Sequence, residues 1–273
     1  MNLELTDEQV VLRDTVRRYL AEKASVTTHV RPMLDDPTGT TAEVWAELAA
    51  LGATGVLVPQ DYGGSGMTMV EAGIVATELG AALHPGPWLS SAVAAARALT
   101  RMVTGAHAAS LLTGIADGST VATIGPLSGP RPVVENAVLR GDIAVLPDAA
   151  AADVVLVLAE DSDGTGLYAV DAKAPGVSVA ERMHVDQTRK LFDVVFDDVA
   201  AQRLASPSAD DIQGLVDDVL IAHAADAVGA ANALARSAAR WRSAGCAASV
   251  AHAACSTPLR ASSTVSYMST QRC

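Results

Sequence analysis

Aromatic residues are scarce in this sequence: two Phe, three Trp and four Tyr make up 3% of its 273 positions. Charged residues are also few, at 18%, whereas half of the residues are hydrophobic. A disordered chain lacks apolar residues instead, so the composition excludes that class and predicts a folded protein with a sizeable core. Ala occupies 53 positions and is the most favourable helix former, which favours a largely helical protein.

Basic residues are also scarce relative to acidic ones. The sequence holds 19 Lys and Arg against 31 Asp and Glu, a formal net charge of −12. Nucleic acids and anionic membranes are bound through basic surfaces, so neither is expected as a partner. No apolar run reaches the roughly 18 residues of a membrane span, and the first nine residues are acidic, unlike a secretory signal. Three cysteines make no disulfide framework, and the combined absences predict a cytoplasmic protein.

The charges are divided unevenly along the chain. All 31 acidic residues lie at or before Asp226, so the first 226 residues carry a formal charge of −17. The remaining 47 residues contain five Arg, no acidic residue and all three cysteines. Two interpretations of residues 240–273 stay open: a solvated, disordered basic tail, or an aberrant segment that does not belong to the upstream fold.

Residues 1–117 are predicted to form a helical domain. Thr followed three residues later by Glu or Gln marks a capping box and therefore a helix start. Gly52 and Gly80 are predicted to end two of these helices, and Ala-rich apolar stretches follow at 89–103 and 106–115. The predicted starts are Thr6, Thr40 and Thr68.

Residues 118–206 show short apolar runs separated by Gly, Pro and Asp instead of helical spacing. Seven such runs at regular spacing predict a compact antiparallel β-barrel or β-sandwich domain. Helical spacing returns over 207–239, which predicts the start of a C-terminal helical domain and an α+β fold class. The predicted strands are 120–124, 133–139, 143–146, 154–158, 167–170, 177–179 and 192–196.

Common catalytic patterns are absent. The sequence has no P-loop lysine, no glycine-rich dinucleotide turn and no Gly-x-Ser-x-Gly elbow. The six His and three Cys do not fall at metal-ligand spacings, so no metal site is predicted. His223 shares the predicted apolar face of residues 212–223, which favours a core position over a ligand role. Composition and periodicity alone predict no reaction.

One glycine-rich segment, PQDYGGSG at residues 59–66, resembles a motif of the acyl-CoA dehydrogenase family. Further similar segments follow in the family's order over about residues 1–235. DQTR at Asp186–Arg189 is similar to bacterial members that act on bulky acyl-CoAs, including subunits of heteromeric enzymes. The other matching segments are 5–9 (LTDEQ), Leu51-Gly52, 78–80 (ELG), 111–123 and 184–199.

The resemblance implies an oxidoreductase that desaturates an acyl-CoA thioester between its α and β carbons. In the family a glutamate removes the α-proton and the β-hydride passes to FAD. The implied fold is a helical domain, a β-barrel and a four-helix bundle, with FAD and the thioester between them and a neighbouring subunit completing the flavin site. Implied partners are acyl-CoA, another acyl-CoA dehydrogenase subunit in a homo- or hetero-oligomer, and an electron-transferring flavoprotein as acceptor.

Two flavin-holding motifs of the family are altered here. Thr-Glu-Pro aligns with Leu127, Ser128 and Gly129, and Trp-Ile-Thr aligns with Val145, Leu146 and Pro147. The resemblance thus assigns cofactor binding to Leu127, Ser128, Leu146 and Pro147. Pro147 offers neither an N–H nor a hydroxyl, so a flavin hydrogen bond is lost there. We expect a weakened FAD site, occupied only in the presence of a partner or not at all.

No residue is predicted to act as the catalytic base. One family position for it aligns with Val219, which cannot accept a proton, and the neighbouring Asp217 and Asp218 are expected on a solvated face. The other position is expected beyond this sequence, because the 62 residues after Asp211 are too few for four helices, which need about 80. We hypothesise that the sequence after about Arg240 is out of frame or otherwise replaced.

Two functional hypotheses follow. The chain is a subunit of an FAD-dependent acyl-CoA dehydrogenase that acts with a partner subunit and is inactive alone. Alternatively, it is a non-catalytic remnant or scaffold subunit of the same family. A third possibility, an acyl-CoA oxidase-like enzyme, would still need the missing base.

Overall fold

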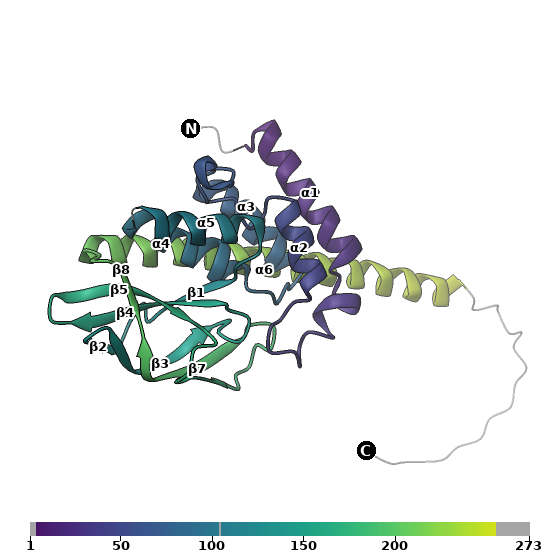
Figure 1. Ribbon diagram of the computed structural model, residues 1–273. Coiled ribbons are helices and arrows are strands. Elements are labelled where there is room, and N and C mark those ends of the chain that lie inside the picture. Colours follow the sequence, from purple (N-terminus) through teal and green to yellow (C-terminus); the bar gives the residue numbers. More distant parts are fainter. Residues whose placement is uncertain (1–3, 104, 255–273) are drawn as a thin grey trace, which may run out of the picture. The chain divides into compact units, whose positions relative to one another are not determined.

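A computed structural model of the chain describes residues 4–103 and 105–254, without the side chains of 106, 107 and 242–254 (Figure 1). Two units are distinguished, Met1–Ala233 and Leu234–Cys273. In the first unit, helices occupy the chain up to Asp117, strands follow between Ala122 and Ala205, and a helix comes after them. The predicted α+β class and element order are confirmed.

The N-terminal part is helical, and its helix starts are set by local capping. Capping boxes open the first and third α-helices at Thr6 and Thr68, as predicted. The second begins one residue later than expected, since Thr41 rather than Thr40 accepts the capping bond from the Val44 N–H. The elements are α1 (Asp7–Lys23), η1 (Val26–Val30), α2 (Ala42–Ala50), η2 (Gln60–Tyr62), α3 (Met69–Ala81), η3 (Leu89–Ala95), α4 (Ala96–Met102) and α5 (Ala106–Asp117).

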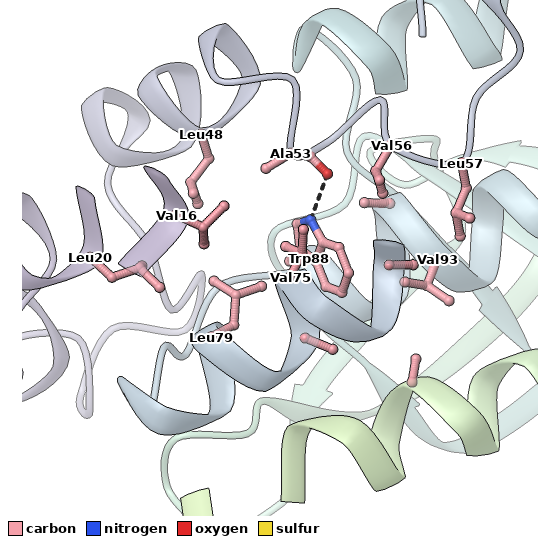
Figure 2. Packing of buried hydrophobic residues seen from close by; sticks show 14 of the residues in the cluster. Val16, Leu20, Leu48, Ala53, Val56, Leu57, Val75, Leu79, Trp88 and Val93 are labelled. Atoms are coloured by element: carbon pink, nitrogen blue, oxygen red, sulfur yellow. Dashed lines mark hydrogen bonds between the residues drawn. The ribbon is translucent and has the colours of Figure 1, made fainter. Parts of the chain in front are cut away.

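These helices pack around a buried tryptophan (Figure 2). The Trp88 side chain is 1% exposed, and its indole Nε1–H donates to the Ala53 carbonyl at 2.8 Å. Leu48 and Val75, both fully buried, belong to the same apolar cluster. Because a buried indole N–H is costly without a partner, this bond holds the start of η3 against the segment after α2.

The middle part is one eight-stranded sheet in the order β6-β7-β3-β2-β4-β5-β8, with β1 paired to β4. The middle β-domain is present as predicted, but its sheet is open and does not close into the expected barrel. It is also mixed, because β1 and β2 both pair with β4 in parallel. The strands are β1 (Ala122–Gly125), β2 (Val133–Glu135), β3 (Val138–Pro147), β4 (Val154–Asp161), β5 (Gly164–Asp171), β6 (Val177–Glu181), β7 (Leu191–Ala200) and β8 (Gln202–Ala205).

One predicted strand is a hairpin. Residues 133–139 were expected as a single strand, but Asn136 and Ala137 both have positive φ, 52° and 61°, and turn the chain between β2 and β3. Two successive left-handed residues match the twist of a tight hairpin. A turn without Gly in an apolar run gives little sequence signal, and β8 was likewise not predicted.

The last described element, α6 (Ala209–Ala254), crosses α3 at very short range. A Cβ added at Gly80 would lie 2.0 Å from the Asp226 carbonyl oxygen, and one at Gly229 would lie 1.9 Å from that of Thr77. Gly80 therefore lies inside α3 to admit the α6 backbone, and the prediction that it ends the helix is wrong. α6 continues past residue 239, where the helical domain was expected to end, and residues 255–273 lie outside the described residues, so the nature of the predicted tail stays a prediction.

Candidate functional site

A pocket of about 630 Å³ opens in the first unit, where the sheet meets the helices. All four predicted cofactor-binding residues, Leu127, Ser128, Leu146 and Pro147, line it. They come from two separate segments, one after β1 and the other at the end of β3. Its remaining lining includes η3 residues, the loop before β7 and two residues of α6, Val219 and His223.

The sheet side of the pocket is apolar and closely built. Ile124, Ile143 and Leu146 are almost fully buried, and a Cβ added at Gly125 would approach Leu146 Cδ1 to 2.8 Å. The Pro147 carbonyl accepts a hydrogen bond from Thr123 Oγ1 at 2.7 Å. Pro147 has no backbone N–H because it is a proline, and its carbonyl already accepts the bond from Thr123. Its backbone therefore has no donor to offer a ligand.

A buried carboxyl group follows Pro147 in this wall. Asp148 is 7% exposed, and its Oδ2 accepts a hydrogen bond from Ser90 Oγ at 2.5 Å. Burial raises the pKa of Asp148 to about 6, against the opposing effects of the Ser90 hydrogen bond and of the positive charges of Arg189 and Lys190. A group that changes charge near neutral pH in a pocket is a candidate functional residue, and the sequence analysis missed it.

Arg189 and Lys190 connect the pocket to the surrounding elements. Arg189 pairs with Asp226 of α6 at 2.6 Å and donates to the His84 carbonyl. Lys190 is 3% exposed, and its Nζ donates to the Leu34 carbonyl at 2.5 Å. Arg189 and Lys190 both line the pocket, and so does Asp186. The two ends of the DQTR segment, Asp186 and Arg189, therefore lie at the pocket.

On α6, the structure reverses two expectations. His223 was expected in the core, but it is solvent-exposed and lines the pocket together with Val219. Asp218 was expected on a solvated face, but it is 6% exposed and accepts from Arg97 and Arg101 at 2.7 and 2.9 Å. The buried residues of α6 repeat every three or four positions, and the polar members of this face disguised it in the sequence: Leu215, Asp218, Ala222, Asp226 and Gly229.

Beside the pocket, two histidines far apart in the sequence stack face to face. The His29 and His84 ring centroids are 5.3 Å apart, and both side chains are buried. Burial, His29 and Arg189 lower the pKa of His84 to about 3, so the ring is neutral. Among the side chains that the structure describes, no group of three His, Cys, Asp or Glu is arranged to hold a metal ion.

Comparisons with known proteins agree with this architecture. Residues 6–119 match the family model for the acyl-CoA dehydrogenase N-terminal domain. Acyl-CoA dehydrogenase IpdE2 of Mycolicibacterium smegmatis is 28% identical over 84% of this chain, which spans 62% of that protein's length. IpdE2 of Mycobacterium tuberculosis is 32% identical over 50% of this chain and 40% of its own length.

A solved structure described as a Tcur3481-Tcur3483 steroid ACAD variant is 27% identical, with a TM-score of 0.72 over 83% of this chain and 64% of the solved chain. The glutaryl-coenzyme A dehydrogenase glutaryl-CoA complex shares the fold, with a TM-score of 0.76 at 19% identity over 85% of this chain and 66% of that one. Residues 6–119 thus form an acyl-CoA dehydrogenase N-terminal domain, and the similar curated proteins and the shared fold extend the likeness to this family over more than four fifths of the chain.

Proposed function

We propose that this chain is a subunit of a flavin-dependent acyl-CoA dehydrogenase that acts on a bulky acyl-CoA together with a partner subunit. One observation carries the proposal: the two segments assigned to the flavin and the α6 position assigned to the base line a single pocket. These segments are separated by about 20 and 70 residues in the sequence, and the fold brings them together. A bulky acyl group agrees with the similarity to the steroid enzyme and with the DQTR segment.

The pocket suits the ring of FAD in volume and in the apolar character of its sheet side. Its volume is within the range of cofactor sites, and Ile124, Leu127 and Leu146 offer apolar surface to a ring. Gly125 keeps the wall clear where a Cβ would crowd Leu146. FAD, when bound, supplies the hydride acceptor. The role of the protein residues is to hold and orient the ring and to exclude water, with Ser128 as the hydroxyl donor.

Fewer hydrogen-bond donors hold the ring than in the family pattern, and this favours a second candidate function, a non-catalytic scaffold subunit. Pro147 contributes no donor, and its carbonyl is bonded to Thr123. Loss of one such hydrogen bond costs about 1 kcal/mol, or about fivefold in affinity. The two candidates therefore differ in whether FAD is retained.

The test is the visible absorption spectrum of the protein after gel filtration, alone and after co-purification with a neighbouring acyl-CoA dehydrogenase chain. We expect little flavin on the chain alone and a flavin spectrum from the co-purified complex. Pro147→Thr restores an N–H and a hydroxyl, and we expect it to retain several-fold more flavin than wild type. If the complex elutes without flavin both with wild type and with Pro147→Thr, the dehydrogenase proposal is contradicted. The non-catalytic scaffold subunit then becomes the supported function.

Flavin on a complex does not by itself show which chain holds the ring. A matched variant, Ser128→Ala, removes the hydroxyl assigned to this chain's own site. If flavin retention by the complex is unchanged in both Ser128→Ala and Pro147→Thr, the flavin lies in the partner and this pocket has another role.

A further inference from the structure

The pocket has an unassigned proton acceptor on α6. Dehydrogenation, if the proposed function holds, begins with loss of a proton from the carbon next to the thioester, and a base must lie within reach of it. Val219 lines the pocket at the position assigned to that base but has no polar atom. Four residues with a carboxylate or an imidazole line the pocket: Asp148, His184, Asp186 and His223.

Three of the four already make hydrogen bonds. Asp148 accepts from Ser90 Oγ and lies beside Pro147, in the wall assigned to the flavin. Asp186 accepts from the Thr188 N–H and hydroxyl at 3.0 and 2.6 Å, which closes a local turn. His184 Nε2 is 2.6 Å from the Arg189 carbonyl oxygen.

His223 differs from the other three. Its imidazole makes no hydrogen bond to any side chain or backbone group that the structure describes, and it lies four residues after Val219, one turn further along the same face of α6. It reaches the pocket from the helix, whereas the predicted flavin residues reach it from the sheet strands and the segment after β1. His223 and the residues assigned to the flavin therefore line the pocket from different elements.

The charges around His223 favour its accepting form. His223 is partly exposed, but the surrounding protein removes water from one side of its ring. This partial desolvation and the positive charge of Arg189 lower the pKa of His223, and Asp226 partly opposes them. The ring is therefore neutral at pH 7 and has an unprotonated nitrogen. An imidazole is the side chain most often used as a general base.

We propose that His223 is the proton acceptor of this site and removes the α-proton of the bound acyl-CoA, in the role for which Val219 has no group. The α-carbon–hydrogen bond breaks, the proton passes to an unprotonated ring nitrogen of His223, and the electron pair stays on the thioester as its enolate. Return of a proton from the imidazolium regenerates the thioester, so the step needs no oxidant. This inference rests on the proposed function, because it requires a thioester in the pocket.

The experiment measures exchange of the α-hydrogens for deuterium, which is separate from turnover. Octanoyl-CoA serves as a linear probe and cholyl-CoA as a bulky one, incubated in D2O with the protein and its partner chain, with flavin added in excess and chemically reduced so that hydride transfer is blocked. Mass spectrometry then reports deuterium incorporation. We expect exchange with wild type and a fall of about 100-fold or more in His223→Gln, the range typical of losing a general base.

Matched variants separate a base from a structural residue. Ala224→Gln places the same amide on the neighbouring exposed residue of α6 and should exchange like wild type. His223→Ala should regain part of the exchange on addition of free imidazole, which a merely structural role would not allow. Asp148→Asn and His184→Gln test the alternative acceptors, and loss of exchange in either one with exchange retained in His223→Gln would overturn the assignment.

Binding is measured in parallel, so that the inference and the proposed function fail separately. NMR of the histidine Cε1–H signals, with the His223 signal identified by its loss in His223→Gln, should show a shift of that signal when either thioester is added. Binding with no exchange by wild type, or with equal exchange in His223→Gln, overturns the inference alone. Absence of binding by both thioesters overturns the proposed function and the inference with it.

Discussion

At the scale of single residues, the pocket is defined by a few polar groups in apolar surroundings. Asp148 is the most deeply placed carboxyl group among those that line it, and its hydrogen bond from Ser90 only partly offsets the cost of burying its charge. Pro147 directly before it withholds a donor. The site is therefore better suited to binding an apolar ring and an acyl chain than a strongly charged ligand.

Asp148 predicts a pH dependence of stability. Its pKa rises from 3.8 in the unfolded chain to about 6 in the folded protein, so the folded state holds the proton more tightly. The stabilisation is present below about pH 4 and is lost as the pH rises through 6. Asp148→Asn cannot ionise and keeps its stability over this range. The difference in free energy of unfolding between Asp148→Asn and wild type should therefore increase by about 2–3 kcal/mol, in favour of the variant, as the pH is raised from 4 to 7.

Urea unfolding of both proteins at several pH values measures this difference. Asp217→Asn is the control, because Asp217 is exposed and, among the residues that the structure describes, accepts a hydrogen bond from Gln213 of its own helix. Its difference from wild type should not depend on pH in this way. A difference for Asp148→Asn that stays constant across the range would show that Asp148 is not buried as described.

At the scale of elements, α6 is held by close backbone packing and by ion pairs. Its backbone touches α3 at Gly80 and Gly229, Asp218 joins it to α4 through Arg97 and Arg101, and Asp226 joins it to Arg189. These contacts set the position from which Val219 and His223 reach the pocket. Changes in this packing should therefore affect both stability and the site.

Replacing two glycines of α3 by alanine should change the free energy of unfolding in opposite directions. Gly80→Ala places a Cβ 2.0 Å from the Asp226 carbonyl oxygen, a backbone atom that cannot turn away, and overpacking should cost about 1–3 kcal/mol. Gly73→Ala meets only Ala225 Cβ at 3.9 Å and should gain up to about 1 kcal/mol from helix propensity. Urea unfolding compares the two, and equal effects would contradict the close crossing of α3 and α6.

Arg189 should matter far more than the neighbouring Arg182. Arg189→Met leaves Asp226, whose Oδ1 is buried and already without a partner, with an uncompensated charge, and we expect a loss of about 2 kcal/mol. Arg182→Met breaks an exposed pair with Asp193 and should cost about 0.5 kcal/mol or less. The double variant Arg189→Met, Asp226→Asn should regain part of the lost stability, because the unpaired charge is removed. If it does not, the unpaired charge of Asp226 is not the cause of the destabilisation.

At the scale of the whole molecule, the helical part and the sheet share one apolar cluster. Leu112 and Ile115 of α5 pack in the same cluster as Leu156 and Leu158 of β4, and Leu215 of α6 also belongs to it. The change from helices to strands near residue 118 lies within the compact unit Met1–Ala233. The division into separate domains there stays a prediction. Within the described residues, no helix has the length and apolar character needed to span a membrane.

A shared cluster predicts that the helices and the sheet unfold together. Emission from the buried Trp45 and Trp88 reports the helical part, and circular dichroism in the strand region reports the sheet. In Trp241→Phe, which leaves these two as the only tryptophans, both signals should change at the same urea concentration. A tryptophan transition at clearly lower urea would show that the two parts fold independently.

The starts of α1 and α3 could be predicted from sequence because each is set within a few residues. Thr6 with Gln9 and Thr68 with Glu71 satisfy backbone groups of their own first turn, and no distant contact is needed. Most strands were predicted for the same local reason, the alternation of apolar runs with turn residues. The ordered resemblance placed Leu127, Ser128, Leu146 and Pro147 at a common site, and all four line one pocket.

The sequence by itself determined the order of helices and strands, the class of the fold and the resemblance to the acyl-CoA dehydrogenases, since each depends on short patterns in a fixed order. Only the tertiary structure decided that the sheet is open, that Gly80 lies under α6, that Asp218 is buried and that His223 faces the pocket. The partners of these residues lie tens to more than a hundred positions away. A residue's burial and pKa depend on those partners, so no local pattern encodes them.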